Sequence, residues 1–159
     1  MKLVAKYDMA APMAFVFGQM VDFDGWERAA MRRGAEVMRS DKLRKIGPGA
    51  TWDAHFRYRA KERDVTLRLD SLTPMTAMGL TGISKLADGV MTMDLLDLGA
   101  TRTRLEVRLE IKPKTIAARI YVQSLRLARS RVERSFAQRV AQFTAEIEDR
   151  YRAAKAAGR

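Results

Sequence analysis

The sequence has no cysteine and a single histidine, His55. Without cysteine there are no disulfides and no thiolate ligands, and one histidine cannot supply the clustered ligands of a zinc site. We therefore expect no metal and no cofactor. The absence of disulfides also suits a reducing compartment, which predicts a cytoplasmic location.

Long hydrophobic runs are missing as well. No apolar stretch approaches the roughly 20 residues of a membrane-spanning helix, and Lys6 and Asp8 interrupt the region where a signal peptide would be apolar. These absences predict a soluble protein. The chain of 159 residues is 47% hydrophobic, enough for a full core. We expect a single domain over residues 1–156.

Acidic residues are scarce near the C-terminus. The net charge is +11, and residues 114–159 hold eleven Lys/Arg against four Asp/Glu. A basic C-terminal third suggests an anionic partner, such as acidic lipid or an acidic protein. A solvated, arginine-rich helix without a specific partner is the alternative.

The hydrophobic pattern changes its period along the chain. Residues 2–8 alternate as a strand, Pro12 stands at the start of a short helix, and Asp24 and Glu27 have capping-box spacing before a second helix over 25–33. Six alternating segments follow up to residue 112. The clearest is TRTRLEVRLEIK, which is apolar on one face and charged on the other, as in an antiparallel sheet covered on one side.

From about Thr115 to Ala156 the period becomes helical, which predicts one helix of roughly 40 residues. Its apolar stripe consists of Leu125, Ala128, Val132, Phe136, Val140, Phe143, Ile147 and Tyr151. The sheet and the helix each have one apolar face. We therefore expect an α+β fold in which the stripe packs on the sheet.

The stretch KIGPGATW raises the question of a phosphate-binding loop. The glycines are not followed by the Lys of a Walker loop, and the next segment alternates like a strand rather than a helix. Gly47, Pro48 and Gly49 therefore predict a turn. Exposed N–H groups of such a turn could still touch the anionic end of a ligand.

The motifs VDFDGWERA and IGPGATW, the element order and the closing helix together resemble the START-like, or SRPBCC, superfamily. The resemblance covers essentially the whole chain and points to the bacterial polyketide cyclase/dehydrase-like branch. It implies a helix-grip fold: a curved seven-stranded antiparallel sheet wrapped around a long C-terminal helix, with two short helices between strands 1 and 2. It also implies an apolar cavity that takes lipids, sterols, polyketides or quinones, with cyclisation or hydrolysis in a minority of members.

The inward-facing residues are the candidates for ligand contact. Methionines fill irregular space and suit varied apolar ligands, although an ordinary core is the alternative. Arg129 falls inside the helix stripe, where it either meets a polar group of the ligand or snorkels to solvent. The full expected set is Trp52, Phe56, Tyr58, Leu67, Met78, Met91, Met93, Leu105, Val107, Arg129, Val132 and Phe136.

Binding or transport of a hydrophobic or amphipathic small molecule is the expected function. The alternative is a cyclase/dehydrase-like enzyme with Tyr58 or Tyr7 as the acid and Arg129 to steady an enolate. No catalytic motif of the family is found, and no catalytic residue is assigned. Strand alternation places His55 on the polar face, so we expect it to be exposed and not catalytic.

A second apolar stripe is expected on the opposite side of the long helix. Ile116, Ile120 and Leu127 share this side. Such a face suits an anionic membrane surface or a homodimer. A helix break near Gln123 that turns all three inward is the alternative. Nucleic acid is not expected, because the aromatic residues face inward. The flanking arginines are Arg119, Arg126, Arg131 and Arg134.

Overall fold

The chain begins with a strand and two short helices, as expected. The computed structural model describes residues 1–158 and begins with β1 (Lys2–Met9), α1 (Met13–Met20) and α2 (Phe23–Arg32). Asp22 caps α2, because its side chain accepts a hydrogen bond from the Gly25 N–H at 3.1 Å. The predicted capping box at Asp24 is therefore wrong. Asp24 lies in the first turn of the helix, one turn before the side chain of Glu27.

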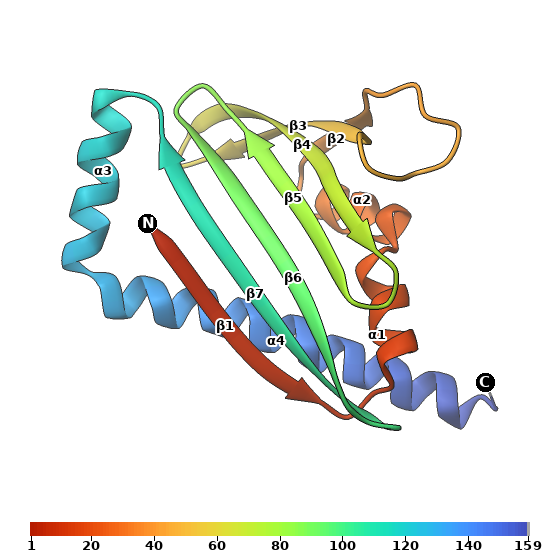
Figure 1. Cartoon of the computed structure of the whole chain (residues 1–159). Helices are drawn as coiled ribbons and strands as arrows, with labels where there is room; N and C mark the ends of the chain where they lie inside the picture. The colour runs from red at the N-terminus through yellow and green to blue at the C-terminus, as the bar shows by residue number, and fades with distance from the viewer. Residues whose placement is uncertain (159) are drawn as a thin grey trace.

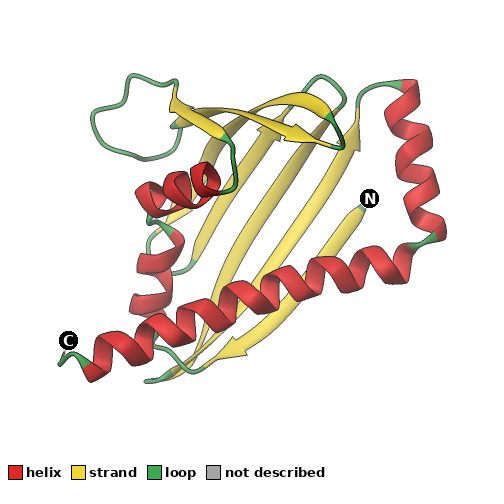
Figure 2. Cartoon of the chain, turned by 180° about the vertical axis from the view of Figure 1, so that it is seen from behind, coloured by secondary structure: helices red, strands yellow, loops and turns green. Residues whose placement is uncertain are grey.

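Seven strands form one antiparallel sheet in the order β1-β7-β6-β5-β4-β3-β2. Figures 1 and 2 show the sheet curving, with the hairpin of β3 and β4 bent over one end. The expected seven-stranded sheet is confirmed. The strands after β1 are β2 (Glu36–Arg39), β3 (Thr51–Tyr58), β4 (Lys61–Thr73), β5 (Ala77–Ile83), β6 (Ala87–Gly99) and β7 (Arg102–Pro113).

The glycine–proline segment is a turn. The Ala50 N–H donates to the Gly47 carbonyl at 2.9 Å, and Gly49 has a φ of 97° after Pro48, as a type II turn requires. The Gly49 N–H donates to the Leu69 carbonyl at 2.8 Å, so it is not available to an anion. A strand follows the turn, which agrees with the exclusion of a phosphate-binding loop.

The C-terminal segment is two helices, α3 (Ile116–Leu127) and α4 (Arg129–Ala156). The prediction of one unbroken helix is wrong, because the backbone leaves helical geometry at Ala128, with φ −111° and ψ 32°. Figure 1 shows α3 standing at a steep angle to α4. No proline or glycine marks the break. It lies where the chain turns from the end of β7 to cross the sheet.

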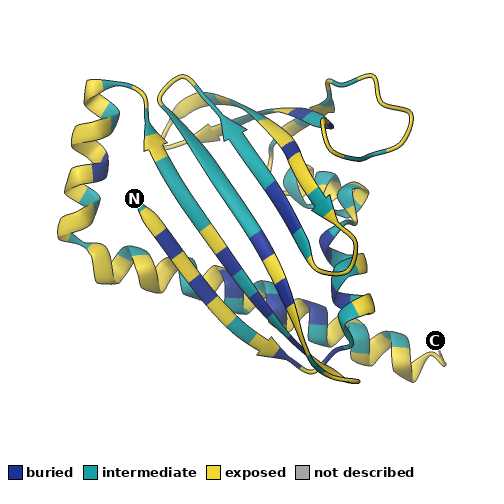
Figure 3. Cartoon of the chain, viewed as in Figure 1, coloured by how far each residue is buried: buried dark blue, intermediate teal, exposed yellow. Residues whose placement is uncertain are grey.

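Figure 2 shows α4 lying across the inner face of the sheet. Buried residues of α4 and of the strands join in one core cluster. Val140, Thr144 and Ile147 are the buried residues of α4. In Figure 3 the buried positions of β5, β6 and β7 gather toward the end where α1 lies, while the other end is half-buried. The sheet therefore has a closed end and a more open end.

Candidate ligand-binding cavity

A cavity of about 860 Å³ lies between the open part of the sheet, α2 and α4. Two rows of paired residues form its floor. Met78, Met93 and Val107 face one another across β5, β6 and β7, and Leu80, Met91 and Leu109 form the neighbouring row. Trp52 and its partner Leu67 extend the floor into β3 and β4. The floor is apolar throughout.

α2 forms one wall through two aromatic contacts. Phe23 stacks on Trp52 of β3 with the ring centroids 5.3 Å apart, and Trp26 stacks on Phe143 of α4 at 5.2 Å. The Trp26 indole N–H donates to the Met20 carbonyl at 3.0 Å, which fixes the ring. None of the α2 residues is fully buried. The helix therefore bridges β3 and α4 beside the cavity while staying half-exposed.

The polar groups of the cavity gather on its helical side. Glu27 is fixed there, because its Oε1 accepts a hydrogen bond from the Trp52 indole N–H at 2.7 Å. The charged and amide side chains that line the cavity come from α2, from the residue that follows its last turn and from α4, so they lie opposite the apolar floor. They are Glu27, Arg33, Arg139, Gln142 and Glu146.

The structure brings many of the expected residues together around this cavity. Val107 is buried, as predicted from its strand. Phe136 is half-buried instead of fully buried, because its ring faces the cavity. Leu67 remains 40% exposed although it faces inward, which reflects the open end of the sheet. The expected residues that line the cavity are Trp52, Leu67, Met78, Met91, Met93, Val107 and Phe136.

Phe56 and Tyr58 lie outside the cavity lining. β4 pairs with β5 only from Thr66, which lies opposite Ile83, so the tip of the β3–β4 hairpin extends past the sheet. The inward side of this tip is not covered by α4, and Tyr58 is 54% exposed. The placement of Tyr58 on a covered face was therefore wrong.

Leu105, Val132 and Arg129 also lie away from the cavity lining. Leu105 is fully buried in the core at the closed end of the sheet, and Val132 is half-buried near the start of α4. The Arg129 Nε donates to Glu133 Oε1 at 2.7 Å on an exposed surface. Arg129 does not lie inside the apolar stripe, because the break at Ala128 interrupts the helix phase from which its position was counted.

Sequence reasoning missed the α2 wall. The sequence did contain a signal for this wall. Its apolar residues follow the three- and four-residue spacing of a helix face, namely Phe23, Trp26 and Ala30. That face was not assigned to the cavity because the sequence does not say where a short helix docks. Leu80, Leu109, Val140 and Phe143 are further lining residues that were not expected there.

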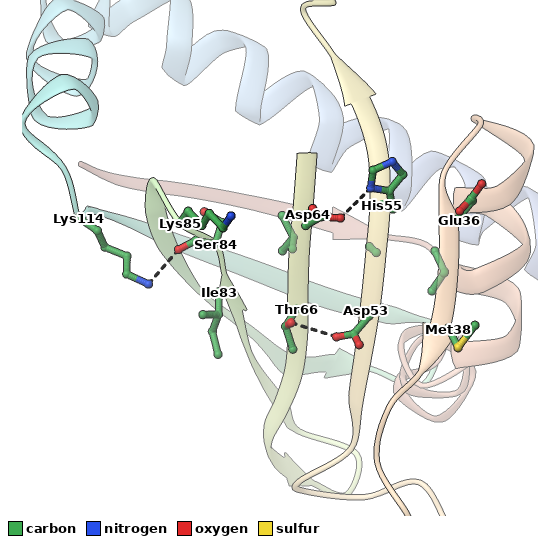
Figure 4. A pocket seen from close by; sticks show the side chains of 13 residues that line it. Glu36, Met38, Asp53, His55, Asp64, Thr66, Ile83, Ser84, Lys85 and Lys114 are labelled. Atoms are coloured by element: carbon green, nitrogen blue, oxygen red, sulfur yellow. Dashed lines mark hydrogen bonds and ion pairs between the residues drawn. The ribbon is translucent and has the colours of Figure 1, made fainter. Parts of the chain in front are cut away.

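A second groove, of about 700 Å³, lies on the outer side of β2 to β5. Figure 4 shows its polar side chains: His55 points toward Asp64, and Thr66 toward Asp53. At its other end, Lys114 Nζ donates to the Ser84 carbonyl at 2.9 Å. The groove mixes acidic and basic groups, and its Asp53, His55, Asp64 and Lys114 are already paired within the chain.

His55 is bound between two carboxylates in this region. Its Nδ1 lies 2.7 Å from Asp64 Oδ1, and its Nε2 lies 2.7 Å from Glu62 Oε2. The Asp64 hydrogen bond raises the pKa of His55 above its ordinary value, and Glu62 adds to the effect. Both ring nitrogens are engaged, so neither is free to take a proton from a nucleophile. The side chain is 42% exposed, which agrees with the expected outer face.

Residues 1–158 contain neither a helix that could span a membrane nor a cluster of metal ligands. None of the helices combines the length and the hydropathy needed to cross a bilayer. The same residues hold no group of three or more His, Asp or Glu side chains arranged to bind a metal ion.

The sequence matches no protein-family model, and a search of curated proteins gives no significant match. Solved structures do match. The Zhui aromatase/cyclase from Streptomyces sp. R1128 is 18% identical with a TM-score of 0.67, covering 97% of each chain. Ara h 8.0201 is 15% identical with a TM-score of 0.58, covering 96% of this chain and 98% of that one. A START superfamily protein from Mycobacterium smegmatis is 10% identical with a TM-score of 0.56, covering 89% and 98%. Identities this low establish a shared fold alone.

Proposed function

We propose that this chain, which has the START-like helix-grip fold, binds a hydrophobic or amphipathic small molecule in the cavity between the sheet, α2 and α4. The observation that carries the proposal is the cavity itself. Its volume of about 860 Å³ falls within the range of small-molecule sites, and its floor is apolar while a few polar groups stand on one side. Lipid, quinone and polyketide-like molecules have this character.

The arrangement favours one orientation of the ligand. The apolar body lies on the methionine and leucine rows, which adapt to different shapes because methionine is flexible. The polar end lies beside Glu27 of α2, Arg33 just after that helix and Arg139 of α4. A buried polar group needs a partner, so this side is where a head group costs least to desolvate.

The test uses the neutral fluorescent probe N-phenyl-1-naphthylamine with the purified protein. Met91 lies in the floor, so Met91→Trp fills part of the cavity. We expect that substitution to weaken probe binding roughly tenfold or more, because the added ring occupies the ligand's space. Met38→Trp is the matched control, since Met38 is 74% exposed on the outer side of the sheet.

Equal probe affinity in both variants and the wild type would show that the probe binds elsewhere, and the proposal would fail. Native mass spectrometry of the purified protein supplies a second readout. We expect a co-purifying apolar molecule that is lost in the Met91→Trp variant and kept in the Met38→Trp variant.

An aromatase/cyclase-type enzyme is the second candidate. The observations that favour it are the fold likeness to the Streptomyces aromatase/cyclase and the Glu27 carboxylate fixed at the cavity. The acids first considered, Tyr58 and Tyr7, do not line the cavity, and neither does Arg129. The test incubates a linear poly-β-ketone with the protein and looks for aldol cyclisation with loss of one water by mass spectrometry. Turnover that Glu27→Gln abolishes would favour the enzyme over the carrier.

The cytoplasmic location and the single domain over residues 1–156 stay predictions. Localisation of a tagged full-length chain in cell fractions tests the first, and the unfolding of a fragment that ends at residue 156 tests the second.

A further inference from the structure

α3 carries three aliphatic side chains that almost nothing covers. Ile116 is 76% exposed, Ile120 is 62% exposed and Leu127 is 92% exposed. The one fully buried residue of this helix is Val122, on the opposite side. Figure 3 shows α3 as largely exposed along its length. The helix does break, at Ala128, but the break leaves all three residues outside. The alternative in which they turn inward is therefore wrong.

The charges around this stripe have one sign. From Pro113 to Val132 the sequence contains no Asp or Glu. Arg119 and Arg126 are both exposed and lie on one flank of the stripe, seven residues and two turns apart. The other basic residues of the segment are Lys114, Arg129 and Arg131. The α3 face, defined as Ile116, Ile120 and Leu127 with Arg119 and Arg126, is both apolar and cationic.

We propose that the α3 face docks the protein on the surface of an anionic lipid bilayer. A helix with an apolar stripe and a basic flank lies in the plane of the interface, with the aliphatic side chains at the acyl boundary. The arginines reach the anionic head groups while their stems stay beside the apolar stripe. The basic segment is attracted to a negative surface, and salt screens this attraction. The burial of the aliphatic side chains also contributes to binding, and salt does not screen that contribution.

A second copy of the chain fits this face less well. A two-fold contact places the same patch on itself, so Arg119 and Arg126 would approach their own copies. The segment from Pro113 to Val132 has no carboxylate to pair with them. Like charges at a contact oppose association, whereas an anionic bilayer neutralises them.

The docking proposal rests on the proposed function in one respect only: the reason for docking would be to load the cavity with its ligand. α3 leads directly into α4, which forms a wall of the cavity, so docking at α3 holds the cavity near a bilayer from which an apolar ligand can load. Docking itself needs no ligand. Vesicle binding without probe binding would therefore mean that the proposed function fails and docking stands. Probe binding without vesicle binding would mean that docking fails and the proposed function stands.

The experiment is co-sedimentation with vesicles. Vesicles of phosphatidylcholine with phosphatidylglycerol are compared with pure phosphatidylcholine, at low and high salt. We expect binding to the anionic vesicles only, weakened but not abolished by salt. Ile120→Glu with Leu127→Glu should weaken it by about tenfold or more. Val4→Glu with Met38→Glu is the matched control, because these residues are also exposed and the charge change is the same.

A site-specific label tests insertion in a nearly unaltered chain. The sequence has no cysteine, so Leu127→Cys and Met38→Cys each accept a single environment-sensitive NBD label. We expect the label at 127 to increase its emission with anionic vesicles, and the label at 38 to stay unchanged.

Three results would overturn the proposal. The first is equal loss of binding in the α3 variant and its control, which would mean non-specific attraction. The second is a label at 127 that ignores vesicles. The third is a concentration-dependent dimer by light scattering, abolished by Ile120→Glu with Leu127→Glu, in a protein that binds no vesicles.

Discussion

At the scale of single residues, local partners decide what a side chain does. His55 is the only histidine of the chain, and its position between Asp64 and Glu62 favours the charged imidazolium. The pKa of His55 is therefore raised in the folded protein, chiefly by the Asp64 hydrogen bond. Glu27 shows the same principle at the cavity, where the Trp52 indole holds its carboxylate in place.

The raised pKa of His55 has a defined consequence for pH. The folded state binds this proton more tightly than the unfolded chain, whose histidine has a pKa of about 6.5. The stabilisation is therefore fully present below about pH 6.5 and is lost as the pH rises through the folded pKa. A single histidine gives one imidazole signal, so an NMR titration measures its pKa directly.

We expect the titration midpoint above about 6.5 in the wild type and a lower value in Asp64→Asn. Asp53→Asn is the control, because Asp53 accepts a hydrogen bond from Thr66 on the same face and does not contact His55 in the described structure. A wild-type midpoint at or below about 6.5 would contradict the ion pairs.

At the scale of elements, the two C-terminal helices use their apolar residues differently. α4 buries Ile147 completely in the core, whereas α3 leaves Leu127 92% exposed. The same type of side chain therefore stabilises the fold in one helix and is available to a partner in the other. The break at Ala128 separates the two roles.

Alanine substitutions measure this difference. Ile147→Ala removes fully buried methyl groups, and we expect it to lower the free energy of unfolding by about 2–5 kcal/mol. Leu127→Ala should change it by less than about 0.5 kcal/mol, since the residue is exposed. Phe136→Ala should cost less than Ile147→Ala, because it enlarges an existing cavity. Urea unfolding provides the values, and equal losses at 147 and 127 would contradict this packing.

At the scale of the whole molecule, the sheet is closed at one end and open at the other. The core, with Met9, Met20, Leu105 and Ile147 fully buried, fills the closed end. The cavity occupies the open end, where Leu67, Leu80 and Leu109 remain partly exposed. The two regions meet at Met78, Met93 and Val107, which belong to the buried core and also line the cavity floor.

Hydrogen exchange should follow this division. Amides with few buried contacts open more often, so we expect those of β2 and α2 to exchange faster than those of residues 95–98 in β6 and residues 103–105 in β7. Adding N-phenyl-1-naphthylamine should slow exchange in α2 and leave the closed end unchanged. Uniform exchange across the sheet, or protection by the probe at the closed end, would contradict the division.

The sequence by itself determined the element types and the side on which most residues lie. Period-two alternation identified β3, β4 and β7, and the helical stripe placed Val140 and Ile147 inward. These patterns are local, because each reports the two faces of its own element. Met78, Met91 and Met93 of the cavity floor were among the expected ligand contacts, whereas Leu80 and Leu109 beside them were not.

Only the tertiary structure decided which faces were covered. Tyr58 lies on the inward side of its strand, yet it is exposed because β5 ends opposite Thr66 and leaves the hairpin tip beyond the sheet. Ala128 breaks the long helix in a segment without proline or glycine, where the chain must turn from the sheet end to cross the inner face. Which neighbour lies over a face depends on where separate elements end relative to one another, and no local period records that.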